Sequence, residues 1–312
     1  MAEHSAIEWT DHTWSPWIGC TKVSPACDGC YAEHLMDTRM GRVTWGPHGE
    51  RSRTSTGYWR KPLAWDREAK AACKPLSVFP SLCDPFDNRA DPAVRRAWFD
   101  LMRSTPNLTW LLLTKRPQSA VEMSEAAGGL PGNAALGATC EDQKRADINV
   151  PHLLRAKLAL RPAFAFLSCE PLLGPIDLSR WTTGPANYLD YCDAVGGPAP
   201  TGVMMLDWVI TGGETDQGQH RARPTNPQWF RDIRDQCAAA GVPYLHKQNG
   251  EWVSVSEVEG PGEIHTFADG RNVRRVGKRK AGRTIDGATY DGFPPTPSSN
   301  PIPHGKRDGG GL

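Results

Sequence analysis

The sequence predicts an α/β protein, a partial (β/α)6 barrel followed by a small C-terminal β extension. Six short apolar runs recur within residues 76–245. Continuous apolar runs of this length are typical of strands that are covered on both faces of a parallel sheet. Segments with helix start and stop signals separate several of the runs. The chain has 312 residues, a length that a single α/β barrel often reaches.

Each of the six predicted strands ends in polar or charged residues. The pattern leaves open a further short strand before Cys20. In barrels of this kind, functional side chains gather at the carboxyl ends of the strands, so these polar clusters mark the expected site. The six predicted strands are Leu76–Pro80, Thr109–Leu113, Ala135–Ala138, Ala163–Leu167, Leu206–Ile210 and Val242–Leu245.

Helix signals lie between the strands. Asp91 and Pro92 form an N-cap with a first-turn proline and predict a helix through about Arg103. The run Thr225-Asn-Pro227 opens a second helix, which Gly241 closes. Weaker helical patterns cover 118–127 and 143–161, and Pro151 is expected to interrupt the latter.

The expected organisation is a barrel over residues 1–247, a small β extension over 248–292 and a disordered tail over 293–312. Proline and glycine break the pattern at 171–205, which we interpret as an insertion or lid loop. The tail is rich in proline and glycine. The extension is expected to be antiparallel, with strands at Trp252–Val258, Ile264–Phe267 and Asn272–Val276.

Composition limits the protein classes. Lysine and arginine total 36 against 35 acidic residues, a net charge of +1 that by itself neither favours nor excludes nucleic acid. Nine cysteines, an odd number in a chain of this size, indicate reduced thiols or metal ligands. The N-terminus lacks a signal-peptide pattern, and no run approaches the ~20 apolar residues of a membrane helix. We expect a soluble cytoplasmic protein without membrane partners.

Three cysteines form the most informative motif. Cys20, Cys27 and Cys30 are spaced C-x6-C-x2-C. A [4Fe–4S] cluster normally takes four thiolates, so three would leave one iron open to an outside ligand. Alternatively, His34 completes C-x6-C-x2-C-x3-H, a set of ligands that zinc accepts. A third interpretation is three inert thiols.

Residues 7–33, which contain this motif, resemble the opening of a phage-associated three-cysteine-motif family that is grouped with radical S-adenosylmethionine enzymes. The resemblance covers roughly residues 6–293. It continues through residues 112–117, 167–176, 208–214, 234–243 and 276–283. It implies a radical S-adenosylmethionine-type barrel, but the family supplies no settled substrate.

The resemblance also implies a mechanism and cofactor contacts. The cysteines would hold the [4Fe–4S] cluster, and an external electron donor would drive cleavage of S-adenosylmethionine to a 5′-deoxyadenosyl radical. In such enzymes a Gly-Gly-Glu after the second strand binds the cofactor's amino group. Counting the possible short strand before Cys20 as the first, Gly-Gly-Glu214 follows the sixth strand here, so Ser81 and Asp84 at the second-strand position are the better candidates. Glu141, which ends the fourth strand, is a third cofactor candidate.

Four further strand-end residues are candidate catalytic or substrate-binding groups. Lys115 and Arg116 end the third strand, where two cations suit a carboxylate or phosphate. Glu170 ends the fifth strand, and Glu214 would line the substrate side. The plain structural alternatives are a solvated helix start for Lys115 and Arg116, a salt bridge for Glu170 and a turn after the strand for Glu214. Cys83, Cys140 and Cys169 also fall at strand ends, as a second cluster, a catalytic thiol or, more commonly, small core residues.

The substrate is the least determined part. Residues 271–283 carry seven basic residues and no acid, a run that favours a nucleic acid or nucleotide substrate, as in modification or repair. A solvated strand pair explains the same run. The rival function is a non-catalytic zinc protein that binds nucleic acid or a partner. Oligomeric state is not predicted.

Overall fold

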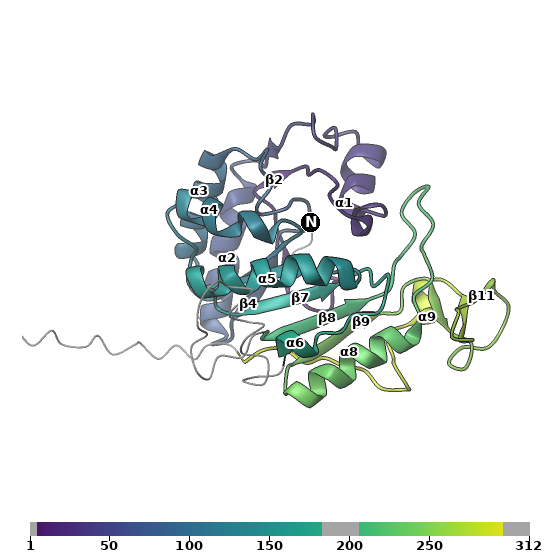
Figure 1. The fold of residues 1–312 in the computed structure, drawn as a ribbon. Helices are drawn as coiled ribbons and strands as arrows, with labels where there is room; N and C mark the ends of the chain where they lie inside the picture. Colours follow the sequence, from purple (N-terminus) through teal and green to yellow (C-terminus); the bar gives the residue numbers. More distant parts are fainter. Residues whose placement is uncertain (1–4, 183–205, 296–312) are drawn as a thin grey trace, which may run out of the picture.

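The computed structural model describes residues 5–182 and 206–295, which build a seven-stranded parallel sheet curled into an open half-barrel (Figure 1). Because all neighbouring strands are parallel, their carboxyl ends share one edge. The predicted partial barrel with a C-terminal β extension is therefore confirmed. In spatial order the strands are β1 (His12–Thr13), β4 (Leu76–Phe79), β5 (Leu108–Thr114), β6 (Ala134–Thr139), β7 (Ala165–Cys169), β8 (Trp208–Gly212) and β9 (Tyr244–Gln248).

The strand additional to the six predicted ones is β1, the short strand before Cys20 whose existence the sequence pattern left open. Thr13 of β1 aligns with Phe79 of β4, and the chain then turns toward Cys20. Two more short strands, β2 (Trp17–Ile18) and β3 (Ser52–Arg53), pair antiparallel beside it. The segment from β2 to β3 also contains three short helical turns, η1 (Pro25–Cys27), α1 (Tyr31–Glu33) and η2 (His34–Arg39).

Helices alternate with the strands (Figure 1). The two best-marked helices begin and end where their caps predict. The side chain of Asp91 accepts a hydrogen bond from Ala93 N at 2.8 Å, and Gly241 ends the second with φ 68°. None of the helices in the described ranges has the length and apolar character needed to cross a bilayer. Besides the three turns given above, the helices that precede the C-terminal extension are η3 (Tyr58–Arg60), α2 (Lys61–Ala71), α3 (Pro92–Arg103), η4 (Pro117–Ser119), α4 (Ala120–Ala126), α5 (Gln143–Leu160), α6 (Ser179–Thr182) and α8 (Pro227–Ala240).

The interruption expected at Pro151 was wrong, because α5 runs through it. A proline inside a helix costs roughly 3 kcal/mol, since it removes one hydrogen bond and crowds the preceding turn. Here Val150, Leu153 and Leu154 are fully buried next to it. Burying each such side chain contributes about 1.5–3 kcal/mol, so packing against the sheet outweighs the local cost.

Alternating side chains of the strands serve two different cores. Trp110 and Leu112 of β5 belong to the core that the helices cover, whereas Leu111 belongs to a second core inside the half-barrel. Trp9 fills this inner core, with its ring centroid 6.5 Å from Phe166 and 6.4 Å from Trp208.

The C-terminal extension is a three-stranded antiparallel sheet in the order β10-β12-β11 beside the short helix α9 (Lys278–Ala281) (Figure 1). The chain then returns along β9, and the Phe293 ring lies tilted against Trp208, with the ring centroids 4.5 Å apart. Of the predicted insertion and tail, residues 183–205 and 296–312 lie outside the described residues. The strands are β10 (Trp252–Ser254), β11 (Ile264–Thr266) and β12 (Asn272–Arg275).

A fully buried histidine links the sheet to this extension. His246 Nδ1 lies 3.0 Å from Thr211 Oγ1, and its Nε2 lies 3.1 Å from Asn249 Oδ1. Asn249 in turn donates to the carbonyl groups of Ala281 and Thr284. Both ring nitrogens are thus used by neutral partners, which favours the uncharged imidazole.

Acid is therefore expected to destabilise the fold through His246. Burial lowers the pKa of its imidazole to about 4, below the ~6.5 of an unfolded chain. As the pH falls below ~6.5, the unfolded state binds the proton first, so the free energy of unfolding decreases down to about pH 4. The full loss from this group is about 3 kcal/mol. Urea unfolding across this pH range measures it; His246→Gln should flatten the slope, and an unchanged slope in that variant would contradict the assignment.

Candidate functional site

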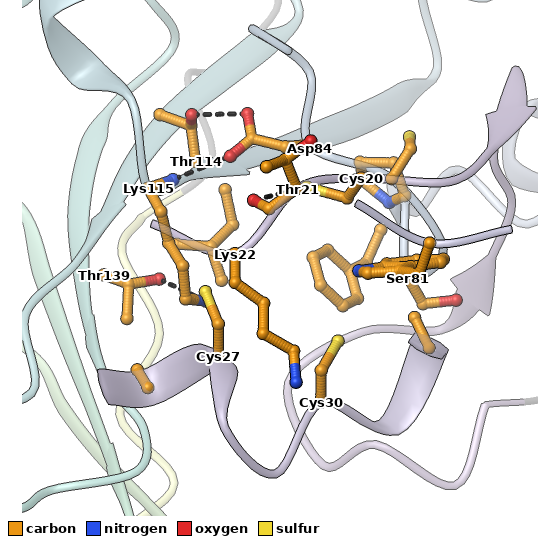
Figure 2. A pocket seen from close by; sticks show the side chains of 17 residues that line it. Cys20, Thr21, Lys22, Cys27, Cys30, Ser81, Asp84, Thr114, Lys115 and Thr139 are labelled. Carbon is orange, nitrogen blue, oxygen red and sulfur yellow. Dashed lines mark hydrogen bonds between the residues drawn. The ribbon is translucent and has the colours of Figure 1, made fainter. Parts of the chain in front are cut away.

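The three motif cysteines line one cavity at the carboxyl edge of the sheet. This cysteine cavity has a volume of about 140 Å³, and Cys20, Cys27 and Cys30 contribute to its wall together with residues that follow β4 and β5. Figure 2 shows Cys27 and Cys30 on the same side of the cavity with Lys22 reaching between them. All three thiols are free. The three cysteines, which lie within eleven residues of the sequence, therefore also share one cavity in the fold.

A fourth cysteine enters the same cavity from another part of the chain. Cys83 follows β4, forms an isolated parallel bridge with Gly19, and lines the cysteine cavity. Burial raises the pKa of the Cys83 thiol, with further contributions from Asp84 and Cys20. Burial likewise raises the pKa of Cys20 to about 12. Cys83 has no spacing relation to the motif, and only the pairing of residues 19 and 83 brings its thiol to the cavity.

The thiols are close but not assembled as ligands. Within residues 5–182 and 206–295, no set of three or more His, Cys, Asp or Glu side chains is arranged to hold a metal ion. His34, the fourth zinc ligand that the spacing allowed, is not in the cavity wall. Its ring instead lies against Gly218, where an added Cβ would meet His34 Cε1 at 2.6 Å.

The donor chemistry of the wall suits an anionic metal–thiolate group. Lys115 lines the cysteine cavity, and Arg116 Nη1 donates to Cys20 Sγ at 3.6 Å. Burial lowers the pKa of Lys115, but the charges of Cys27, Cys30, Asp84 and Glu141 together raise it more, so the net shift is upward. Burial raises the pKa of Cys20 and Cys30, and Arg116 and Lys115 respectively offset part of that increase, which favours the thiolate form that binds metal. The residues therefore fit a cluster held by Cys20, Cys27 and Cys30.

Arg116 and Asp84 hold the cysteine loop, residues 20–30. Arg116 Nη1 lies 3.0 Å from Asp84 Oδ2, and its Nη2 donates to Thr21 O at 2.8 Å. Asp84 also accepts hydrogen bonds from Thr114 Oγ1 at 2.6 Å and Lys115 N at 2.9 Å. Burial lowers the pKa of Arg116, while Asp84 and Cys20 raise it more, so the cation is favoured. The polar atoms of Arg116 and Asp84 are therefore engaged in contacts within the protein.

Glu141 contacts the middle of the loop. Its side chain is fully buried, and Oε1 accepts a hydrogen bond from Ala26 N at 3.3 Å. Arg145 lies 3.8 Å from the same oxygen and donates to Val23 O at 3.1 Å. The other oxygen, Oε2, has no hydrogen-bond partner among the described residues.

Glu214 and Arg223 hold the far side of the loop. Arg223 Nε donates to Glu214 Oε2 at 2.8 Å, while its other nitrogens reach Asp28 Oδ2 at 3.1 Å and Pro25 O at 3.0 Å. Burial raises the pKa of Glu214, but its hydrogen bonds from Arg223 lower it more, so it stays ionised. The His220 ring also packs against the loop, and this approach requires glycine at position 29, because a Cβ there would meet the ring at 2.5 Å.

A larger cavity of about 500 Å³ adjoins the cysteine cavity and shares Cys30, Ser81 and Lys115 with it. We call it the mouth cavity. Glu170 lines it and lies 3.2 Å from Lys247 Nζ. Glu214 also contributes to its wall.

The predicted site residues thus separate into three groups. Ser81, Lys115, Glu170 and Glu214 line the mouth cavity, whereas Asp84 lines only the cysteine cavity. Arg116 and Glu141 line neither and contact the cysteine loop instead. Catalytic and cofactor roles for all of them stay predictions.

Sequence reasoning missed Arg223, Lys247, Gln248 and Lys278. Lys247 and Gln248 end β9, so the strand-end rule that selected the other candidates could have found them. Arg223 lies in a connecting segment that no local pattern marks, whereas Lys278 begins α9 inside the basic run 271–283, which the sequence marked only as a whole.

Most cations of the basic run at 271–283 form ion pairs or hydrogen bonds within the protein. Arg271 pairs with Asp269, and Arg275 pairs with Asp216. Arg274, Lys280 and Arg283 bind carbonyl oxygens or Asp291. Five of its seven cations are therefore engaged, which weakens the case for a phosphate-backbone surface there.

The strand-end cysteines Cys140 and Cys169 are fully buried in the core under the helices, where they pack as small core residues.

Fold and site together define the class, an open parallel (β/α) half-barrel whose mouth carries a three-cysteine loop. A family model described as "protein of unknown function (DUF5131)" matches residues 4–294. The chain belongs to this family. No curated protein matches it. Among solved structures, a mutant of spore photoproduct lyase is similar at 9% identity, 85% coverage of this chain, 68% of that chain and a TM-score of 0.42. A likeness at this level carries no functional argument.

Proposed function

We propose that this protein is a radical S-adenosylmethionine-type enzyme in which Cys20, Cys27 and Cys30 hold a [4Fe–4S] cluster. The observation that carries the proposal is the placement of three free thiols in a cavity that shares part of its wall with the 500 Å³ mouth cavity. A redox group held there would lie beside a space large enough for small molecules. When bound, the cluster supplies the electron that cleaves S-adenosylmethionine to a 5′-deoxyadenosyl radical.

The protein's own residues would position the reactants. Arg116, Glu141 and Arg223 fix the cysteine loop through Thr21 O, Ala26 N and Pro25 O. Lys115 places a cation beside Cys27 and Cys30. Ser81, in the wall of both cavities, is the candidate for a polar cofactor contact. An external reductant must deliver the electron, and the proposed substrate class is a nucleic acid or nucleotide.

One observation favours a second candidate function. Cys83 gives the cysteine cavity a fourth thiol, and four thiolates are the usual ligands of a closed structural zinc site. In that case the loop is purely structural, and the protein is a non-catalytic module that binds nucleic acid or a partner.

Metal analysis separates the two candidates. We expect anaerobically reconstituted protein to contain about four irons with sulfide, to absorb broadly near ~400 nm and to cleave S-adenosylmethionine when dithionite is added. Protein with one tightly bound zinc, no such absorption and no cleavage would overturn the proposal and support the zinc module.

A further inference from the structure

The mouth cavity has two chemically different ends. Cys30, Ser81 and Lys115 form the end beside the cysteines. Lys247, Gln248 and Lys278 belong to β9 and α9 and line the same cavity. Strands β6, β7 and β8 separate β5 from β9 in the sheet, so the two groups stand on opposite sides of the mouth. We call the second group the distal end.

The wall of the mouth cavity has an excess of positive charge. Three lysines line it, Lys115, Lys247 and Lys278, against two carboxylates. One carboxylate, Glu170, pairs with Lys247 at 3.2 Å, and the other, Glu214, is held by Arg223 from outside the cavity. No carboxylate in the described ranges lies within ion-pair distance of Lys278. Lys278 is thus an exposed, uncompensated cation at the distal end.

A buried acceptor next to these lysines lacks a donor. Gln248 is only 8% exposed and lines the mouth cavity. Its Nε2 donates to Gly213 O at 3.2 Å, while Oε1 has no hydrogen-bond partner among the described residues. Leaving a buried acceptor unsatisfied costs about 1–3 kcal/mol, and a ligand with an N–H group would remove that cost.

We infer that the distal end binds a nucleotide-sized phosphate ester, with the phosphate at Lys278 and an N–H donor of the base at Gln248 Oε1. A lysine binds phosphate as a point charge, and a phosphate monoester, with a charge of about −1.5 to −2 at neutral pH, attracts it more strongly than a carboxylate does. Because the neighbouring cations of residues 271–283 are mostly engaged, a single phosphate is favoured over a polymer backbone. The inference rests on the proposed function and names its substrate class.

The test is equilibrium binding to the reconstituted full-length protein, measured by calorimetry at low salt. The probes are inorganic phosphate, the four ribonucleoside 5′-monophosphates and the four matching nucleosides. We expect at least one monophosphate to bind about tenfold or more tightly than its nucleoside, a difference of about 1.4 kcal/mol. Lys278→Met should remove this advantage. Arg279→Met is the matched control, because Arg279 is exposed on the same short helix but outside the cavity wall.

Gln248→Met tests the second contact. It should weaken the monophosphate but leave inorganic phosphate unchanged. Equal affinities for every monophosphate and its nucleoside, or equal losses in Lys278→Met and Arg279→Met, would overturn the inference. Since binding is read without S-adenosylmethionine cleavage, phosphate binding that depends on Lys278 in a protein that lacks the cluster would refute the proposed function alone.

Discussion

Replacing Cys27 with alanine is expected to abolish cluster binding, with loss of nearly all iron and of the absorption near ~400 nm. In the proposed cluster each of the three thiolates would bind one iron, so the loss of Cys27 would leave one iron without its protein ligand. S-adenosylmethionine cleavage should fall to background in the same variant. Iron and sulfide analysis after anaerobic reconstitution is the measurement, with circular dichroism to show that the variant is folded.

Cys83→Ala is the matched control for Cys27→Ala. Both thiols line the same cavity, but only Cys27 belongs to the motif. An open cluster predicts that Cys83→Ala keeps about four irons and its cleavage activity. Equal metal loss in the two variants would show that Cys83 is a ligand, and the site would then be closed.

Arg116→Met is expected to lower the free energy of unfolding by about 3–5 kcal/mol. The Arg116 and Asp84 side chains are 8% and 7% exposed, so removing the cation leaves a buried carboxylate without its ionic partner. The remaining hydrogen bonds from Thr114 and Lys115 favour the lower half of that range. The variant also loses the contact with Thr21 O, so cluster incorporation should decrease. Urea unfolding and iron content measure the two effects.

Two further variants separate charge from loop anchoring. Arg116→Met combined with Asp84→Asn removes the stranded charge and should recover part of the lost stability without restoring iron content. Lys22→Met removes a more exposed ion pair of the same loop, with Glu33, and should change stability by at most ~1 kcal/mol. A loss in Lys22→Met as large as in Arg116→Met would mean that burial of the Arg116–Asp84 pair is not the cause.

The sequence determined the parts that depend on neighbouring residues. Apolar runs located the six main strands, and capping residues such as Asp91 and Gly241 located helix ends within a residue. The C-x6-C-x2-C spacing predicted that Cys20, Cys27 and Cys30 would act together. These features depend on hydrogen bonds and side-chain periodicity within a few residues, which a sequence displays directly.

Tertiary structure alone decided which strand-end side chains face a cavity and which hold the cysteine loop. Glu141 meets Ala26 across 115 residues, and Arg223 meets Asp28 across 195. The pairing of Gly19 with Cys83 likewise brought an unrelated thiol to the site. Such contacts form because the curled sheet gathers distant strand ends at one edge. Polar groups buried there must find partners wherever the fold places them, and no local pattern records that choice.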